Sequence, residues 1–491
     1  TSKANTLTIK GKSGSNANDK LNGKSNGRVL KLNTGIPVTI ENLTITGGDA
    51  KTGSDDDKSG GGIYLANGTL KLGDGAKISG NHAAAFGGGI YVASGAKLFM
   101  YETAMIGDGI KYTATSSTLT SSGTTGCANA AVSGGGIYNN GGEVYIGYEA
   151  LDGSTLVKHD MDSRSGVCRN YAYGDNGAGG GIYNQGTLYI ASGFVSYNQS
   201  PANGGGIYTA GTDQVTATFT VEAPKVTNNN RFVMYGNKAD QGGAVYNEKF
   251  STVNMSTCQI GTSTEKDRNT ASTKGGAIYQ NGIFNISGAA YIYPGSEKLN
   301  DVYLTKYNVI NISGTLTTFD NIVVATITPN EYKRGTKIVT SDSSVSINNA
   351  IVGKFKLSQD DSDWTKNIVD SNKGITITAP VYVAGASETT VSGVTYKKGL
   401  SIEEGALGTK SKPFKFISDA VGVFEDSSSP AVVTIVGTTY PVAQEIPDTF
   451  TTSKATALTL KGLSSSSVGT IKRYTTVPSS TASDGSALTV N

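Results

Sequence analysis

Cysteine, proline, charge and long apolar runs are all scarce in this chain of 491 residues. Its three cysteines (Cys127, Cys168 and Cys258) are too few for a disulfide framework, although a bridge between Cys127 and Cys168 stays open. No run of 18 apolar residues occurs, so the sequence predicts no transmembrane helix. The 16% of charged residues give a net charge of +2 without a long basic run, which excludes the electrostatic footprint of a nucleic-acid-binding protein.

Glycine is abundant instead, at 65 residues, and it is concentrated in a repeat. There is no Gly-X-Y period, so collagen is excluded. The repeat is Gly-Gly-(Gly/Ala)-(Ile/Val)-Tyr, and seven copies indicate a solenoid. Their central glycines, which we expect to lie at a corner where backbones approach closely, are Gly61, Gly88, Gly135, Gly180, Gly205, Gly243 and Gly276.

The copies are separated by 27, 47, 45, 25, 38 and 33 residues. The short spacings fit one solenoid turn of about 25 residues, whereas 47 and 45 fit either two turns or one turn with a long loop. We favour loops, because Thr113–Asn129 and Ala150–Tyr173 are polar and lack the alternation of strands.

A second element often precedes the glycines: an apolar residue, two others and then Asn. Asparagine tolerates left-handed backbone geometry, and at stacked corners its amides can bond to one another as a ladder. The predicted corner residues are Asn81, Asn170, Asn198 and Asn237.

Between the corners, apolar residues alternate with polar ones. Leu70 and Leu72 fall on one face of a strand, and Leu188 and Ile190 repeat that pattern. Short strands, fixed corner residues and turns of about 25 residues together predict an all-β parallel β-helix.

The pair of motifs, an apolar residue and Asn followed by Gly-Gly-(Gly/Ala)-Ile, resembles the repeat of the polymorphic outer-membrane protein family. More broadly it is similar to the pectin-lyase-like β-helix surface proteins of bacteria. The resemblance covers about residues 40–288, and it implies a right-handed helix and an adhesive, surface-exposed role. The chain departs from the family in the Tyr that follows each Ile, and it shows no C-terminal membrane barrel.

The end of the chain repeats its beginning. Residues 2–11 match residues 453–462 at seven of ten positions, and residues 27–33 resemble residues 485–491. Upstream, Phe414, Ile417 and Val421 recur at helical spacing and predict a short capping helix over residues 412–421.

We therefore divide the chain into four parts. Residues 1–300 form the repeat β-helix, residues 301–380 its last turns or a small β segment, residues 381–400 a junction, and residues 401–491 the start of a further β-helix unit. Two interpretations follow: a piece of a longer tandem protein, or separate subunits that stack head to tail.

A polysaccharide-processing site would need clustered carboxylates, or a basic residue beside them. One stretch of the chain offers such residues, which we interpret as a solvated loop. We expect no catalytic site, metal site or cofactor. The residues are Asp108, Lys158, His159, Asp160, Asp162, Arg169 and Asp175.

The tyrosines of the repeat are the strongest binding candidates. By strand alternation each should point outward, either as a row that holds glycans or as a row that stacks on itself; we favour stacking. They are Tyr64, Tyr91, Tyr138, Tyr183, Tyr208, Tyr246 and Tyr279.

The sequence thus predicts an extracellular or cell-surface bacterial protein, structural or adhesive, that forms a fibre or tandem array with copies of itself. Its other partners would be host or matrix glycans or proteins. The alternative is a polysaccharide lyase or hydrolase, or a carbohydrate-binding β-helix.

Overall fold

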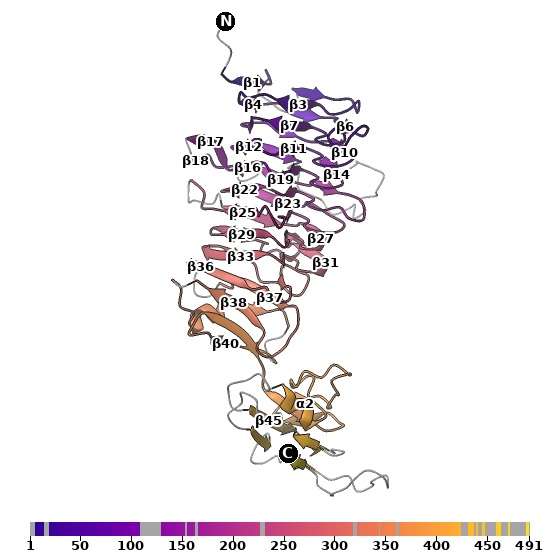
Figure 1. The fold of residues 1–491 in the computed structure, drawn as a ribbon, viewed down its shortest axis with the longest axis vertical. Helices are drawn as coiled ribbons and strands as arrows, with labels where there is room; N and C mark the ends of the chain where they lie inside the picture. The colour runs from indigo at the N-terminus through magenta and orange to yellow at the C-terminus, as the bar shows by residue number, and fades with distance from the viewer. Residues whose placement is uncertain are drawn as a thin grey trace. The chain divides into compact units, whose positions relative to one another are not determined.

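In the computed structural model, nearly all of the regular secondary structure is β-strand (Figure 1). Two compact units divide the chain, and each is described by itself. Unit 1 contains residues 1–330, 338–358 and 370–374, and unit 2 contains residues 331–337, 359–369 and 375–491. The structure describes residues 5–13, 19–108, 129–152, 155–162, 165–225, 231–317, 322–342, 344–359, 363–423, 431–436, 438–439, 444–446, 458–462, 470–471 and 488–490.

Unit 1 is a parallel β-helix, as the sequence predicts. Most of its turns contribute one strand to each of three sheets, and Figure 1 shows the turns stacked in sequence order from β1 to β36. Within each sheet every strand pairs in parallel with the corresponding strand of the next turn. Such stacking leaves the core as a narrow column between the three sheets.

Sheet 1 in this unit runs through β1 (Leu7–Lys10), β4 (Val38–Glu41), β8 (Thr69–Leu72), β12 (Lys97–Met100), β16 (Glu143–Ile146), β22 (Thr187–Ile190), β25 (Ala217–Val221), β29 (Ser251–Met255), β33 (Ile283–Gly288), β36 (Ile310–Leu316) and β38 (Lys337–Ser341). Sheet 2 runs through β2 (Lys20–Asn22), β5 (Thr44–Thr46), β9 (Lys77–Ile78), β13 (Met105–Gly107), β19 (Gly166–Cys168), β23 (Phe194–Ser196), β26 (Phe232–Tyr235), β30 (Cys258–Ile260) and β34 (Tyr291–Ile292).

Sheet 3 runs through β3 (Leu30–Asn33), β7 (Ile63–Asn67), β11 (Ile90–Val92), β15 (Ile137–Asn139), β21 (Ile182–Asn184), β24 (Ile207–Thr209), β28 (Val245–Asn247), β32 (Ile278–Gln280), β35 (Val302–Leu304), β37 (Ala325–Pro329) and β39 (Phe355–Leu357). Short strands at the corner before sheet 3 are β6 (Asp49–Ala50), β10 (Asn81–Ala83), β14 (Asn129–Ala131), β20 (Tyr171–Ala172), β27 (Lys238–Gln241) and β31 (Thr270–Lys274).

The core is built from columns of aliphatic side chains, one residue per turn. On sheet 3 the residue after the glycines points inward and has no exposed surface. Burial of one such side chain stabilises the fold by about 1.5–3 kcal/mol. This column is Ile63, Ile90, Ile137, Ile182, Ile207, Val245, Ile278 and Val302.

The two long repeat spacings are single turns with insertions, as predicted. Ile90 pairs directly with Ile137, and Ile137 pairs with Ile182. The first predicted loop, Thr113–Asn129, lies almost wholly outside the described residues.

The prediction of a second loop over Ala150–Tyr173 is wrong. It contains most of an antiparallel hairpin, β17 (Tyr148–Asp152) with β18 (Thr155–Lys158), and then β19 and β20 of the solenoid. The strands are too short for a clear alternation, and their pairing supplies the order that the pattern does not reveal.

Unit 2 contains a parallel sheet of β42 (Val381–Ala384), β45 (Ala431–Val436) and β48 (Leu458–Gly462), with the hairpin of β43 (Thr389–Val391) and β44 (Val394–Tyr396). The segment predicted as a junction, residues 381–400, therefore holds three strands. The other elements of the chain are β40 (Thr365–Val369), β41 (Gly374–Thr378), β46 (Thr438–Thr439), β47 (Gln444–Ile446), β49 (Thr470–Ile471), β50 (Leu488–Val490), the 3₁₀ turn η1 (Glu265–Asp267), α1 (Asn349–Gly353) and α2 (Ile417–Gly422).

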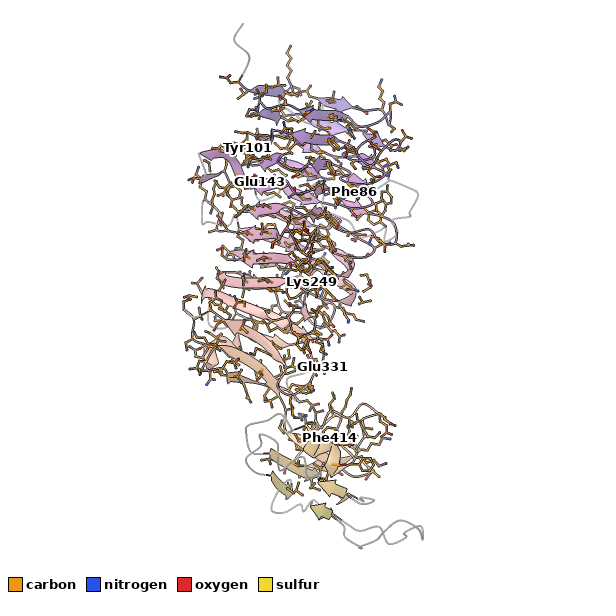
Figure 2. All side chains as sticks on the ribbon, in the orientation of Figure 1. Phe86, Tyr101, Glu143, Lys249, Glu331 and Phe414 are labelled. Atoms are coloured by element: carbon orange, nitrogen blue, oxygen red, sulfur yellow. The ribbon has the colours of Figure 1, made fainter. Side chains whose placement is uncertain are left out.

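The helix predicted over residues 412–421 is present as α2, but it starts later. Phe414 is not helical: its N–H donates to the carbonyl of Tyr382, and its own carbonyl accepts from Ala384. Pro413 disfavours helix for the residue before it and has no N–H to give. Phe414, which Figure 2 labels, and Ile417 still belong to one buried cluster with residues of β42 and β45.

The central glycines are required by close approach between turns. A Cβ on Gly180 would lie 2.2 Å from the carbonyl oxygen of Gln199, and one on Gly135 would lie 2.4 Å from that of Tyr171. Positive φ is found instead at the first glycine of each triplet, for example +64° at Gly179. The repeat therefore needs two glycines for two different reasons.

Substitution of Gly180 by Ala should lower the free energy of unfolding by about 2 kcal/mol or more, because the backbone of the next turn cannot move away alone. Gly353→Ala is the matched control, since no atom lies within 4 Å of its added Cβ and its φ is not positive. Urea unfolding followed by circular dichroism measures both. Equal stabilities for the two variants would contradict this account.

Candidate functional site

The corner asparagines form one continuous ladder through unit 1. The predicted residues Asn81, Asn170, Asn198 and Asn237 all belong to it. Three further asparagines complete it, and each amide Nδ2 donates to the Oδ1 of the next at 2.8–3.1 Å. The order is Asn81, Asn129, Asn170, Asn198, Asn237, Asn269 and Asn300.

Asn198 shows how completely each amide is used. Its Oδ1 accepts from both the backbone N–H and the Nδ2 of Asn170, each at 3.0 Å. Its Nδ2 donates to the carbonyl of Val167 at 3.0 Å and to Oδ1 of Asn237 at 3.1 Å. The side chain has no exposed surface, so without these bonds its amide oxygen and nitrogen would be buried without a partner.

The described ladder ends at Asn300. In this turn Asp301 stands before the inward-pointing Val302, where earlier turns have the glycines of the repeat. In earlier turns the N–H of the central glycine donates to a glycine carbonyl of the following turn, as Gly243 does to Gly275. The N–H of Gly276 donates instead to Oδ1 of Asp301 at 2.7 Å. Burial raises the pKa of this carboxyl group, and Thr328 donates a second hydrogen bond to it.

Asn198→Ala should cost about 3 kcal/mol of stability, since it removes the acceptor of the buried N–H of Asn170 and the side-chain donor to the carbonyl of Val167. Asn254→Ala is the control. Asn254 lies half-buried on the outer face of sheet 1, where water can replace its bonds to Thr220 and Asn285. Calorimetric unfolding of both variants tests the difference, and similar losses would refute the assignment.

The repeat tyrosines stack face to face along sheet 3 as one column. The spacing between successive ring centroids is 4.5–5.6 Å, and most neighbouring rings are near parallel. An eighth ring, Tyr303, continues the column beyond the seven that the sequence indicates. The column is Tyr64, Tyr91, Tyr138, Tyr183, Tyr208, Tyr246, Tyr279 and Tyr303.

Cations cover both ends of this column. The guanidinium carbon of Arg28 lies 4.6 Å from the centroid of Tyr64, with Lys31 Nζ at 5.4 Å. At the other end Lys274 Nζ lies 4.6 Å from the centroid of Tyr303 and donates to its hydroxyl at 2.9 Å. Each terminal ring therefore gains a cation–π contact where it has no further tyrosine.

This column is not an open platform for sugars. Tyr91 and Tyr138 are only 6% and 7% exposed, and Phe86 lies 4.5 Å from Tyr138. Hydroxyl groups are engaged too: Tyr138 donates to Gln185 at 2.8 Å, and Asn140 donates to Tyr91 at 2.6 Å. The ring faces that a sugar would need are occupied by neighbouring rings.

The column predicts a loss of stability in alkali. Burial raises the pKa of Tyr138 above its usual value, so the folded chain keeps a proton that the unfolded chain releases above about pH 10. The free energy of unfolding should fall as the pH rises above that value, by about 1.4 kcal/mol per pH unit for each such tyrosine. Urea titrations between pH 8 and alkaline pH measure the slope.

Tyr138→Phe should make that slope shallower, because it removes one ionising group. Tyr307→Phe is the control, since it also removes one tyrosine hydroxyl but from a side chain that is 90% exposed. A slope that is unchanged by Tyr138→Phe would disprove this origin of the alkaline sensitivity.

A second aromatic group lies on the outer face of sheet 1, beneath the β17–β18 hairpin. Phe99 stacks on Tyr145 at 4.7 Å, and Tyr148 and Leu156 of the hairpin pack against the same cluster. Figure 2 places Tyr101 and Glu143 on the hairpin side of the solenoid and Phe86 on the other. The hairpin is thus held on the solenoid by packing rather than extended as a free loop.

His159 follows this hairpin and lies between two carboxylates. Its Nδ1 is 2.7 Å from Glu149 and its Nε2 is 3.1 Å from Glu102, while its ring stacks on Tyr101 at 5.0 Å. Burial raises the pKa of Tyr101 to about 12. The sequence indicates His159 but neither glutamate: Glu102 precedes the polar stretch, and Glu149 meets His159 only through the pairing of β17 with β18.

The other residues of that stretch have separate partners. Lys158 pairs with Glu222 at 3.1 Å, and Asp160 accepts from the backbone of Lys225 at 2.7 Å. Asp108 pairs with Lys77 at 3.3 Å.

Three residues of the stretch remain. The N–H of Asp162 donates to the carbonyl of Glu102 at 2.7 Å. Asp175 is exposed, and Arg169 lies at the corner after β19 with φ +58°. Asp108, Lys158 and Asp160 of the stretch thus bind partners in other parts of the chain.

Two cysteines are buried thiols. Burial raises the pKa of Cys168 and of Cys258 to about 12, so both stay protonated at neutral pH. Cys168 Sγ donates to the carbonyl of Asp108 at 3.0 Å. Cys127 lies outside the described residues, so a bridge to Cys168 stays a prediction.

No protein-family model, curated protein or solved structure matches this chain. Among the residues that the structure describes, no three His, Cys, Asp or Glu side chains are grouped as ligands for a metal ion. In the same part of the chain no helix has both the length and the apolar character to cross a bilayer.

Proposed function

We propose that this chain is an extracellular structural protein whose β-helix units join end to end as a fibre or tandem array. The observation that carries the proposal is the turn that occurs twice. Strands β1 and β3 of unit 1 lie in residues 2–11 and 27–33, and strands β48 and β50 of unit 2 lie in residues 453–462 and 485–491, which resemble them. A surface that matches another part of the same molecule builds open, repeating assemblies.

The chemistry of the repeat supports a structural role. Its most regular polar and aromatic residues contact their counterparts in the next turn: Asn198 donates a hydrogen bond to Asn237, and Tyr246 stacks on Tyr279. The resemblance to the polymorphic outer-membrane protein repeat supports a place on a bacterial surface, with adhesion to host or matrix glycans or proteins as a further role.

A polysaccharide-processing enzyme is the second candidate, and one observation favours it. Glu102 and Glu149 flank His159 on one side of the solenoid, and paired carboxylates are the groups that glycoside hydrolysis requires. Release of unsaturated products from uronate polymers, or of reducing ends from neutral ones, would reveal it. Activity abolished by Glu149→Gln would favour this second function.

Negative-stain imaging of the purified chain over a range of concentrations tests the leading proposal. We expect filaments of constant width that lengthen as the concentration rises, because each added copy presents the same end as the one before. Monodisperse single particles at every concentration would overturn it.

A further inference from the structure

The turn of β48, β49 and β50 shows which strands pair with a turn of this sequence. In unit 2, β48 pairs in parallel with β45, so that Ala431 is opposite Leu458 and Val433 is opposite Leu460. The pairs β46–β49 and β47–β50 continue the same stacking around the turn. A turn of this sequence therefore accepts β45, β46 and β47 as its preceding layer.

The first turn of unit 1 exposes the apolar residues that such a layer would cover. Leu7 is 46% exposed and Leu21 is 40% exposed, whereas their neighbours in register, Val38 and Ile45, are 1% and 0% exposed. In unit 2 the residue that matches Ile9, Leu460, packs against the buried cluster that contains Val433. Ile9, its counterpart in unit 1, is half-buried as Leu460 is, whereas Leu7 on the same strand is exposed.

We infer that a second copy of this chain covers the exposed Leu7 and Leu21: β1, β2 and β3 of one copy bind β45, β46 and β47 of another, in the place of that copy's own β48, β49 and β50. This inference rests on the proposed end-to-end assembly and specifies its contact. Because residues 7–11 match residues 458–462, the register follows: Leu7 lies opposite Ala431, Thr8 opposite Val432 and Ile9 opposite Val433.

The exchange replaces the strand hydrogen bonds of one turn by those of another. Leu7 and Leu21 become buried, while Leu460 of the displaced turn loses its contact with the cluster that contains Val433. The copy's own turn is tethered and competes at a high effective concentration. Contact between copies should therefore depend on protein concentration. It should also increase when the tethered turn is weakened, for example by Leu460→Asp.

Mixing of two full-length chains, each with one added cysteine, tests the register. Both carry Cys127→Ser, and the remaining native thiols, Cys168 and Cys258, are buried. One chain carries Thr8→Cys and the other Val432→Cys. Paired residues on neighbouring strands lie about 4.8 Å apart, within reach of a disulfide.

The matched control replaces the first chain by one with Lys10→Cys. Thr8 and Lys10 share a face of β1, but Lys10 is displaced from Val432 by two residues, or about 6.6 Å along the strand. We expect disulfide-linked heterodimers to form about tenfold faster with Thr8→Cys than with Lys10→Cys, as the geometry of the bond demands. Leu460→Asp in the Val432→Cys chain should raise the yield several-fold.

Equal rates for the two pairs would overturn the inference. So would faster linkage of Thr8→Cys to a Thr459→Cys chain than to the Val432→Cys chain, because that result would mean direct stacking of β48 on β1. Filaments seen in the microscope together with either result would leave the proposed function standing while this contact fails. The absence of both filaments and linkage would refute both.

Discussion

The solenoid depends on the hydrogen bonds that the side-chain amide of the corner asparagine makes. A chain that turns sharply inside a protein leaves backbone N–H and carbonyl groups pointing into a dry corner, where an unpaired group costs about 1–3 kcal/mol. Asn198 answers this cost by bonding to the backbone N–H of Asn170 and to the carbonyl of Val167. Because its remaining bonds run to the asparagines above and below it, each turn requires the next to present the same residue at the same place.

The other regularities follow from that stacking. Once the corners are aligned, the central glycine must leave room for the carbonyl of the next turn, as Gly180 does for Gln199. The residue after the glycines then points inward and the tyrosine outward, turn after turn. A column of rings is the result of placing one aromatic residue at a fixed position on strands about 4.8 Å apart.

The fold could be predicted from the sequence because the repeat marks corner, core and outer face in one short motif. The ladder was only partly predictable. Asn269 and Asn300 lack an apolar residue three positions before them, since η1 and a turn separate them from the preceding strand. Tyr303 was missed because Asp301 replaces the glycines in front of it. Glu102 and Glu149 meet His159 only through the pairing of the hairpin, which no local pattern reveals.

The hydrogen bonds between ladder asparagines all run in one direction, with the donor on the earlier turn and the acceptor on the later one. Their amide dipoles therefore point the same way along the solenoid axis and add, much as peptide dipoles add in a helix. The solenoid has a polarity, with oxygen facing one end of the ladder and N–H facing the other. Units joined in the same sense continue that polarity across every junction, whereas units joined in opposite senses would bring like ends of the dipole together.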